Sequence, residues 1–135
     1  MTVRISREKV SDSFVAKIEA LSGQDLLACY QCGKCSAGCP MARYMDVLPS
    51  QMIRLAQLGQ AEDLLGSQAI WMCVSCLTCN SRCPKGVKIA EVIEAIRQVE
   101  LRSRRDHLVV EDMPRGLLAS VPPIALIGSM RKFTS

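Results

Sequence analysis

The sequence lacks the features that mark several large classes of protein. No apolar run approaches the roughly 18 residues that suggest a membrane span, and residues 117–128, the longest apolar stretch, are interrupted by Pro122 and Pro123. The first ten residues, MTVRISREKV, have neither the apolar core nor the small-residue cleavage site of a secretory signal. We therefore expect a cytoplasmic protein without a transmembrane segment, in a compartment where thiols stay reduced.

The sequence also lacks motifs for nucleotide binding and patterns typical of β-strands. The chain has no glycine-rich phosphate loop and no dinucleotide fingerprint, so we expect no nucleotide site. No segment alternates between apolar and polar residues for long enough to predict a strand. The single histidine, His107, is expected to be a surface group rather than a ligand.

What the chain does have is eight cysteines in two matching sets of four. The first set is Cys29, Cys32, Cys35 and Cys39, followed by Pro40, and the second is Cys73, Cys76, Cys79 and Cys83, followed by Pro84. Each cysteine of the second set lies 44 residues after its counterpart in the first, and no cysteine is left over. This spacing, with its closing proline, is the one that bacterial ferredoxins use for 4Fe–4S clusters. The sequence therefore predicts two 4Fe–4S clusters.

The spacing also predicts which cysteines share a cluster. Two-residue gaps let three successive thiolates surround one face of a cluster, whereas the fourth cysteine of each run ligates the other cluster in two-cluster proteins. The first predicted set is Cys29, Cys32, Cys35 and Cys83, and the second is Cys73, Cys76, Cys79 and Cys39. The proline after each fourth cysteine suits the first turn of a helix, where a missing N–H costs nothing.

Two other uses of paired cysteines are less favoured. A disulfide framework needs an oxidising compartment, which the missing secretory signal argues against. Zinc sites also use pairs of cysteines two residues apart, but they need no third cysteine at the same spacing followed by a fourth and a proline.

The formal net charge of +4 is poor support for nucleic acid as a partner. It counts eight cysteines as neutral thiols, whereas each oxidised 4Fe–4S core with four thiolates carries about −2, which brings the loaded protein close to neutrality. We therefore predict no nucleic-acid partner.

Helical periodicity accounts for most of the remaining chain. The expected helices cover residues 14–21, 49–58, 61–65 and 89–99, with Ser11, Asp12 or Ser13 as the first cap. Gly23, Gly59 and Gly66 end the first three, and Ser67 caps a turn that leads into Cys73. In the last helix, Glu94 and Gln98 are expected to pair on the outer side.

These patterns predict an all-α protein, an alpha-helical ferredoxin domain with two 4Fe–4S clusters and an extended C-terminal tail. The expected boundaries are residues 1–23 for an N-terminal segment and helix, residues 24–105 for the ferredoxin domain and residues 106–135 for the tail. The tail is rich in proline, glycine and large aliphatic residues, so we expect it to dock onto a partner.

The strings CYQCGKCSAGCP (residues 29–40) and WMCVSCLTCNSRCP (residues 71–84) resemble the C subunit of heterodisulfide reductases and its bacterial relatives. The resemblance covers roughly residues 11–105. It implies a small protein that passes electrons from an A subunit with flavin and iron–sulfur clusters to a disulfide-reducing B subunit. The chain lacks the cysteine-rich CCG segments of the B subunit, so we expect no catalytic site on this chain alone.

Two other functions remain open at this point. A free, diffusible two-cluster ferredoxin would use the same motifs, although the apolar tail argues against it. The same helical domain also occurs in the iron–sulfur subunits of flavin dehydrogenases such as the anaerobic glycerol-3-phosphate enzyme.

Overall fold

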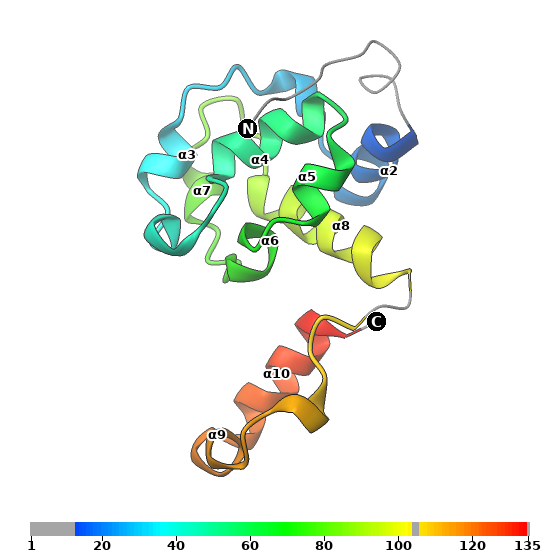
Figure 1. The fold of residues 1–135 in the computed structure, drawn as a ribbon. Helices are drawn as coiled ribbons and strands as arrows, with labels where there is room; N and C mark the ends of the chain where they lie inside the picture. Colours follow the sequence, from blue (N-terminus) through cyan, green and yellow to red (C-terminus); the bar gives the residue numbers. More distant parts are fainter. Residues whose placement is uncertain (1–12, 104–105, 135) are drawn as a thin grey trace. The chain divides into compact units, whose positions relative to one another are not determined.

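The computed structural model of the chain describes residues 13–103 and 106–134 (Figure 1). It divides into two compact units, Met1–Arg97 and Gln98–Ser135. The described residues form helices and turns and no strand, which confirms the all-α prediction. None of the helices in these two ranges has the length and apolar character needed to cross a membrane.

Most of the helices belong to the first unit. Its elements are α2 (Ser13–Ser22), η1 (Leu26–Ala28), α3 (Lys34–Ala37), η2 (Ala42–Tyr44), α4 (Pro49–Gln57), α5 (Ala61–Leu65), α6 (Ala69–Met72), α7 (Thr78–Arg82) and α8 (Ile89–Leu101), the last of which runs past Arg97. The four helices expected from the sequence are all present, and α5 has the expected bounds. Gly23 and Gly59 follow α2 and α4 in the left-handed conformation, with φ of 64° and 65°. The predicted caps Ser11 and Asp12 lie outside the described residues.

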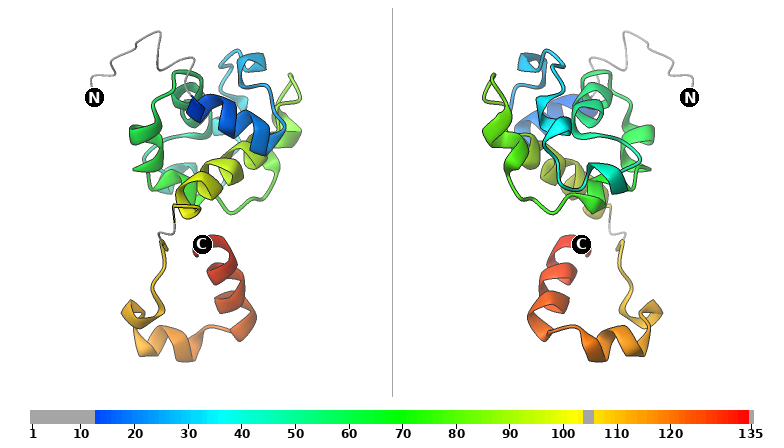
Figure 2. Two further views of the ribbon diagram at one scale, coloured as in Figure 1. Left: turned by 90° about the vertical axis from the view of Figure 1, so that its right-hand side faces the viewer. Right: turned by 90° about the vertical axis from the view of Figure 1, so that its left-hand side faces the viewer.

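The core of this unit is aliphatic. Its fully buried side chains include Ile18, Leu26, Met52, Ile53, Leu64, Ile70, Val92, Ile93 and Ile96. They come from α2, η1, α4, α5, α6 and α8, so the helices on both sides of each cysteine motif share one core. The short helices α3 and α7 lie side by side (Figures 1 and 2). This packing brings the two cysteine motifs together.

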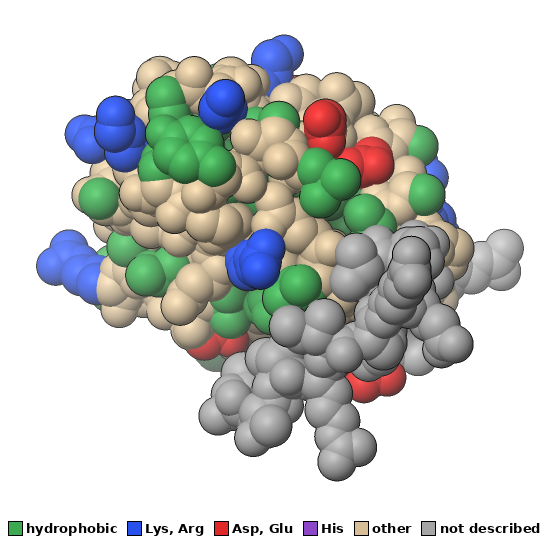
Figure 3. Space-filling view, turned by 90° about the horizontal axis from the view of Figure 1, so that it is seen from above, with side chains coloured by type: hydrophobic (Ala, Val, Ile, Leu, Met, Phe, Trp, Pro, Cys, Tyr) green, Lys and Arg blue, Asp and Glu red, His purple; other side chains and the backbone are tan. Residues whose placement is uncertain are grey.

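The surface of the unit is partly apolar. On the face shown in Figure 3, exposed hydrophobic side chains form separate patches with Lys and Arg side chains beside them. Leu27, Tyr30, Tyr44, Val74 and Leu77 are each more than half exposed. All five lie within or beside the segments that carry the cysteines.

Asp46 fixes the start of α6, the helix that leads into Cys73. Its carboxylate accepts hydrogen bonds from the Ser67 hydroxyl (3.0 Å) and from the backbone N–H groups of Gln68 (3.0 Å) and Ala69 (2.8 Å). Ser67 Oγ also accepts from Ala69 N at 3.0 Å, which confirms its predicted capping role. Burial alone would raise the pKa of Asp46, but these hydrogen bonds outweigh it and lower the pKa below its usual value.

The second unit contains η3 (Val110–Asp112), α9 (Arg115–Ser120) and α10 (Pro123–Phe133), so this segment is helical rather than extended. Pro122 and Pro123 do prevent one continuous helix, as the sequence indicates. However, Pro123 is the first residue of α10, where the fixed φ of proline suits a helix and its missing N–H costs nothing. The backbone N–H groups of His107 and Leu108 donate to the carbonyl of Phe133, at 2.8 and 3.2 Å, and join the two ends of the unit.

Candidate iron–sulfur centres

The two cysteine motifs fold into loops with the same backbone conformation. In the first loop, Gln31 and Gly33 have positive φ values of 64° and 77°. In the second loop the equivalent residues, Ser75 and Leu77, have φ values of 52° and 62°. Gly33 and Leu77 then start the short helices α3 and α7. The 44-residue repeat of the sequence is therefore also a repeat of backbone geometry.

This conformation has a chemical use. Left-handed residues that alternate with ordinary ones turn successive backbone N–H groups toward one concave side, and such concavities bind anions and iron–sulfur clusters. Each loop thus has a backbone conformation that can present amide donors to the sulfur atoms of a negatively charged cluster. Leucine and glutamine rarely adopt positive φ, so the loops hold strained residues at these positions.

The middle cysteine of each loop is exposed, and the pKa of its thiol is lowered. The pKa of Cys32 is lowered first by a hydrogen bond from the backbone N–H of Lys34. The pKa of Cys76 is lowered first by the Thr78 side chain and then by the Thr78 backbone N–H. The Cys76 sulfur lies 3.3 Å from Thr78 Oγ1, within hydrogen-bond distance. Lys34 and Thr78 are themselves equivalent positions of the repeat.

The third cysteine of each loop is buried, and burial raises the pKa of its thiol. Burial raises the pKa of Cys35 and raises the pKa of Cys79 to about 11. The charge of Cys73 adds to the increase at Cys79, and that of Cys35 makes a smaller addition. Cys35 and Cys79 therefore lie close enough to interact, although they belong to different loops. Without a metal both side chains are thiols, and iron must displace their protons to bind.

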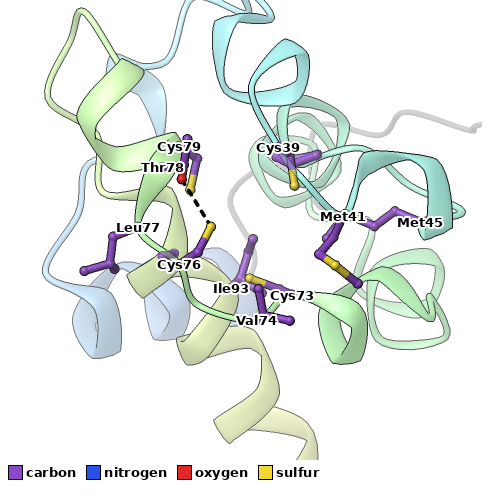
Figure 4. A pocket seen from close by; sticks show the side chains of 12 residues that line it. Cys39, Met41, Met45, Cys73, Val74, Cys76, Leu77, Thr78, Cys79 and Ile93 are labelled. Atoms are coloured by element: carbon purple, nitrogen blue, oxygen red, sulfur yellow. Dashed lines mark hydrogen bonds between the residues drawn. The ribbon is translucent and has the colours of Figure 1, made fainter.

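A cavity beside the second loop collects four cysteines. Cys39, Cys73, Cys76 and Cys79 all line it, and their sulfur atoms point toward the same space (Figure 4). The cavity holds about 360 Å³ of empty space, part of it open to solvent. Met41, Met45, Val74, Leu77 and Ile93 are among its apolar lining residues. Cys39 thus belongs to the first motif by sequence and lies at the second loop in space.

Cys83 lies near Tyr30, a residue of the first loop. The pKa of Tyr30 is raised, first by its hydrogen bond to Cys32 and then by desolvation, with additions from the charges of Cys32, Cys83 and Cys29. Cys83 is therefore near the tyrosine that follows Cys29. Lys85, two residues after Cys83, places its Nζ atom 5.8 Å from the centroid of the Tyr30 ring.

The prolines that close the motifs occupy turns instead of helix starts. Ala42 N donates to Cys39 O (3.2 Å), and Gly86 N donates to Cys83 O (3.2 Å). Each fourth cysteine is thus the first residue of a four-residue turn, and each proline is the second, where its fixed φ is favourable. The prediction of helix starts at Pro40 and Pro84 is wrong in this respect. The turns direct the chain away from each fourth cysteine.

Two buried side chains that the sequence did not predict, Gln57 and Arg97, form hydrogen bonds to the backbone at the start of each loop. Gln57, at the end of α4, donates from Nε2 to the carbonyls of Leu26 (2.7 Å) and Cys29 (3.0 Å). Arg97, on α8, donates from Nη1 to the carbonyls of Ile70 (3.0 Å) and Cys73 (3.1 Å). Polar residues at these helix positions predict solvent exposure, so the sequence pattern alone could not identify them.

The residues fit two 4Fe–4S clusters. Cys73, Cys76 and Cys79 of the second loop share a cavity with Cys39 of the first motif, and Cys29, Cys32 and Cys83 all lie near Tyr30. Within residues 13–103 and 106–134, no three His, Cys, Asp or Glu side chains meet closely enough to hold a single metal ion. In a cluster each thiolate binds a different iron atom, so the four need not meet at one point. The eight cysteines form no disulfide.

Comparison with known proteins agrees with this geometry. Residues 25–87 match the model of the family described as "4Fe-4S dicluster domain". This segment contains all eight cysteines and both loops. Residues 25–87 therefore match a 4Fe–4S dicluster domain, and the chain has the eight cysteines that two 4Fe–4S clusters need.

The similarity extends to curated proteins with a more specific name. The chain is 37% identical over 93 residues to the C subunit of the H(2):CoB-CoM heterodisulfide,ferredoxin reductase of Methanothermobacter thermautotrophicus, which covers 69% of this chain and 50% of the relative. It is 42% identical over 81 residues to the iron-sulfur C subunit of the CoB–CoM heterodisulfide reductase of Methanopyrus kandleri, covering 60% of this chain and 41% of the relative. The resemblance to the C subunit of heterodisulfide reductases is confirmed.

The match is partial in length. A third relative, the C subunit of the Ferredoxin:CoB-CoM heterodisulfide reductase of Methanosarcina mazei, is 32% identical over 100 residues, which cover 72% of this chain and 62% of the relative. The chain spans about half the length of two Methanothermobacter relatives with which it aligns. The relatives are named as subunits, which implies an assembly with other chains.

Proposed function

We propose that this chain is the electron-transfer iron–sulfur subunit of a heterodisulfide-reductase-like complex. It relays electrons through two 4Fe–4S clusters between an A subunit, with flavin and iron–sulfur clusters, and a disulfide-reducing B subunit. The observation that carries the proposal is the pair of equivalent cysteine loops, packed together through α3 and α7, in a chain similar to named C subunits. We infer a cytoplasmic location, where these thiols remain reduced.

We also propose that the fourth cysteines cross over between the loops. One cluster is held by Cys29, Cys32, Cys35 and Cys83, and the other by Cys73, Cys76, Cys79 and Cys39. The cavity shared by Cys39 and the second loop supports the second set. The effect of Cys83 on Tyr30 supports the first.

The chain's own contribution is to bind the clusters, to set their surroundings and to keep them close together. Each bound cluster accepts and gives up one electron. The eight cysteine thiolates would hold the clusters, backbone amides of the loops would donate hydrogen bonds to them, and apolar side chains such as Ile93 and Met41 would limit water around the second. All eight cysteines are committed to iron, so no thiol is available to attack a disulfide.

The C-terminal segment, residues 106–135, is proposed as a docking element for the disulfide-reducing partner. Ile124 and Ile127 of α10 are 75% and 55% exposed, and Leu117 of α9 is 45% exposed. Large aliphatic side chains gain about 1.5 kcal/mol or more each when a partner buries them, less the cost of ordering the segment. A free ferredoxin has little reason to expose them.

The experiment that tests the proposal is analysis of the anaerobically purified chain. We expect about eight iron and eight sulfide per chain, and two one-electron reduction steps with dithionite. We expect no multiple turnover of a disulfide substrate by the isolated chain. An iron content near one or two per chain, or sustained disulfide reduction by the pure protein, would contradict the proposed role.

A further inference from the structure

The helices that follow the two loops extend the internal repeat. Ser36 Oγ accepts a hydrogen bond from the backbone N–H of Ser50 (2.9 Å), the second residue of α4. Asn80, 44 residues after Ser36, accepts through Oδ1 from the backbone N–H of Ala90 (3.0 Å), the second residue of α8. A side chain of α3 therefore caps the start of α4, and a side chain of α7 caps the start of α8. The second residues of α4 and α8 are therefore equivalent.

Gln57 and Arg97 occupy the same place in these equivalent helices. Gln57 is the ninth residue of α4, which starts at Pro49, and Arg97 is the ninth residue of α8, which starts at Ile89. Their acceptors are equivalent as well, because Ile70 and Cys73 follow Leu26 and Cys29, respectively, by 44 residues. Both side chains join the carbonyl of the first cysteine to that of the residue three positions earlier.

The two side chains differ in charge. Gln57 is neutral and 6% exposed, whereas Arg97 is a cation and only 1% exposed. Arg97 also donates from Nη2 to Ser75 Oγ (3.1 Å), within the second loop. The sequence suggested that Glu94 pairs with Gln98, but Glu94 forms its ion pair with Arg97 instead. The Glu94 side chain is 49% exposed, so the cation is buried toward the loop and its counterion faces water.

A buried cation beside a cluster affects its reduction. Reduction adds a negative charge, and a nearby positive charge stabilises the reduced state in proportion to how little water screens it. The first loop has cations near it too, in Lys34 and Lys85, but both are exposed and are therefore screened by water and salt. Arg97 is the one of these three cations that is buried, so water screens its charge least.

We propose that Arg97 is a positioning residue that holds the second loop and raises the reduction potential of the cluster bound there, and that Gln57 is its neutral counterpart at the first loop. The two clusters are thereby made unequal by one residue of an otherwise matching pair. The inference rests on the proposed cluster binding and goes beyond it, because it assigns the higher-potential role to the second loop's cluster.

The test is a redox titration followed by EPR on the wild-type chain and four variants. The second cluster's signal is the one that changes in Cys76→Ala. Arg97→Gln, which gives the second loop the side chain that holds the first, should lower that cluster's reduction equilibrium constant about tenfold, equal to about 59 mV. Glu94→Gln, which removes the counterion, should raise it. Arg97→Lys keeps the charge and should stay near wild type, and the first cluster's potential should stay constant throughout.

Opposite shifts in Arg97→Gln and Glu94→Gln support the proposal, because a purely structural role gives no reason for a rise in either variant. Intact clusters with an unchanged second potential in Arg97→Gln would overturn it. If Arg97→Gln loses its cluster, Glu94→Gln decides: a higher potential supports the proposal, and an unchanged one refutes it. The iron content of the wild-type chain tests the proposed function separately from the role of Arg97. A wild-type chain without two clusters refutes the proposed function itself.

Discussion

At the scale of single residues, the loops depend on a few backbone conformations that most residues avoid. Gly33 and Leu77 adopt the same left-handed conformation at equivalent positions, yet only glycine does so without strain. The cost for a residue with a side chain is about 1–2 kcal/mol. The backbone is therefore unstrained at Gly33 of the first loop and strained at Leu77 of the second, although both residues have the same left-handed conformation.

Exchanging the residue types at these positions should have opposite effects. Gly33→Ala meets no atom within 4 Å of the added Cβ, so only backbone strain changes, and it should lower the stability of the loaded chain by about 1 kcal/mol. Leu77→Gly should raise the stability by a similar or smaller amount, since it also removes an apolar side chain from the cavity. The measurement is the guanidinium midpoint for loss of cluster absorbance under anaerobic conditions. A neutral Gly33→Ala would contradict the left-handed loop.

The repeated cysteine motif could be identified from the sequence because spacing is a local property, and the ligand assignment stays a prediction. Gln57 and Arg97 could not, because their acceptors lie 28 and 24 residues away, at Cys29 and Cys73. Their equivalence is also hidden by a change of offset. The motifs repeat after 44 residues but the following helices after 40, since the segment with η2 lengthens only the first connection.

At the scale of elements, α6 depends on a residue far from it in sequence. The Asp46 carboxylate accepts three hydrogen bonds from residues 67–69 at the start of α6. The helix ends at Met72, directly before Cys73. This contact ties the connection after the first motif to the entrance of the second. The sequence predicted the local cap Ser67 but not Asp46, because a carboxylate 22 residues before Gln68 gives no local signal.

Asp46→Ala should lower the stability at neutral pH by about 1 kcal/mol, as the loss of a helix cap does. The pKa of Asp46 is lower in the folded chain, so its contribution is fully present above the unfolded-state pKa of about 3.9. It is lost only as the pH falls through the lower folded-state value. The difference between wild type and variant, from guanidinium midpoints of cluster loss, should therefore be equal at pH 7 and pH 5.

The control for Asp46 is Glu62→Gln, which removes a carboxylate from the first turn of α5 at an exposed position. It should change the midpoint by a few tenths of a kcal/mol at most. If the control costs as much stability as Asp46→Ala, a general charge effect explains the loss better than the cap at α6.

The C-terminal segment, residues 106–135, shows what proline and glycine residues can and cannot predict about helices. Proline and glycine residues after residue 106 predict an extended segment. However, a helix that ends at one of these residues can be followed by another helix. Pro123 begins α10 and the chain continues for eleven helical residues to Phe133. A break in periodicity therefore locates helix ends without showing that helices are absent.

At the scale of the whole molecule, the second unit is the part proposed to recognise a partner. Deleting residues 116–135 removes α10, most of α9 and the exposed Ile124 and Ile127. We expect both clusters to remain intact by EPR, because all ligands lie before residue 84, and co-purification with the disulfide-reducing partner to be lost. Ile124→Ala with Ile127→Ala is a milder variant that should weaken the association. Wild-type affinity in the truncated chain would refute the docking role.

The central claim is that two clusters are held by cysteines exchanged between the motifs. Cys39→Ala tests it most directly, because Cys39 belongs to one motif by sequence and lines the cavity of the other. We predict that EPR of the reduced variant shows an altered signal from the cluster held by Cys73, Cys76 and Cys79, with the other signal unchanged. An unaltered signal from that cluster, with the loss instead at the cluster of Cys29, Cys32 and Cys35, would contradict the account.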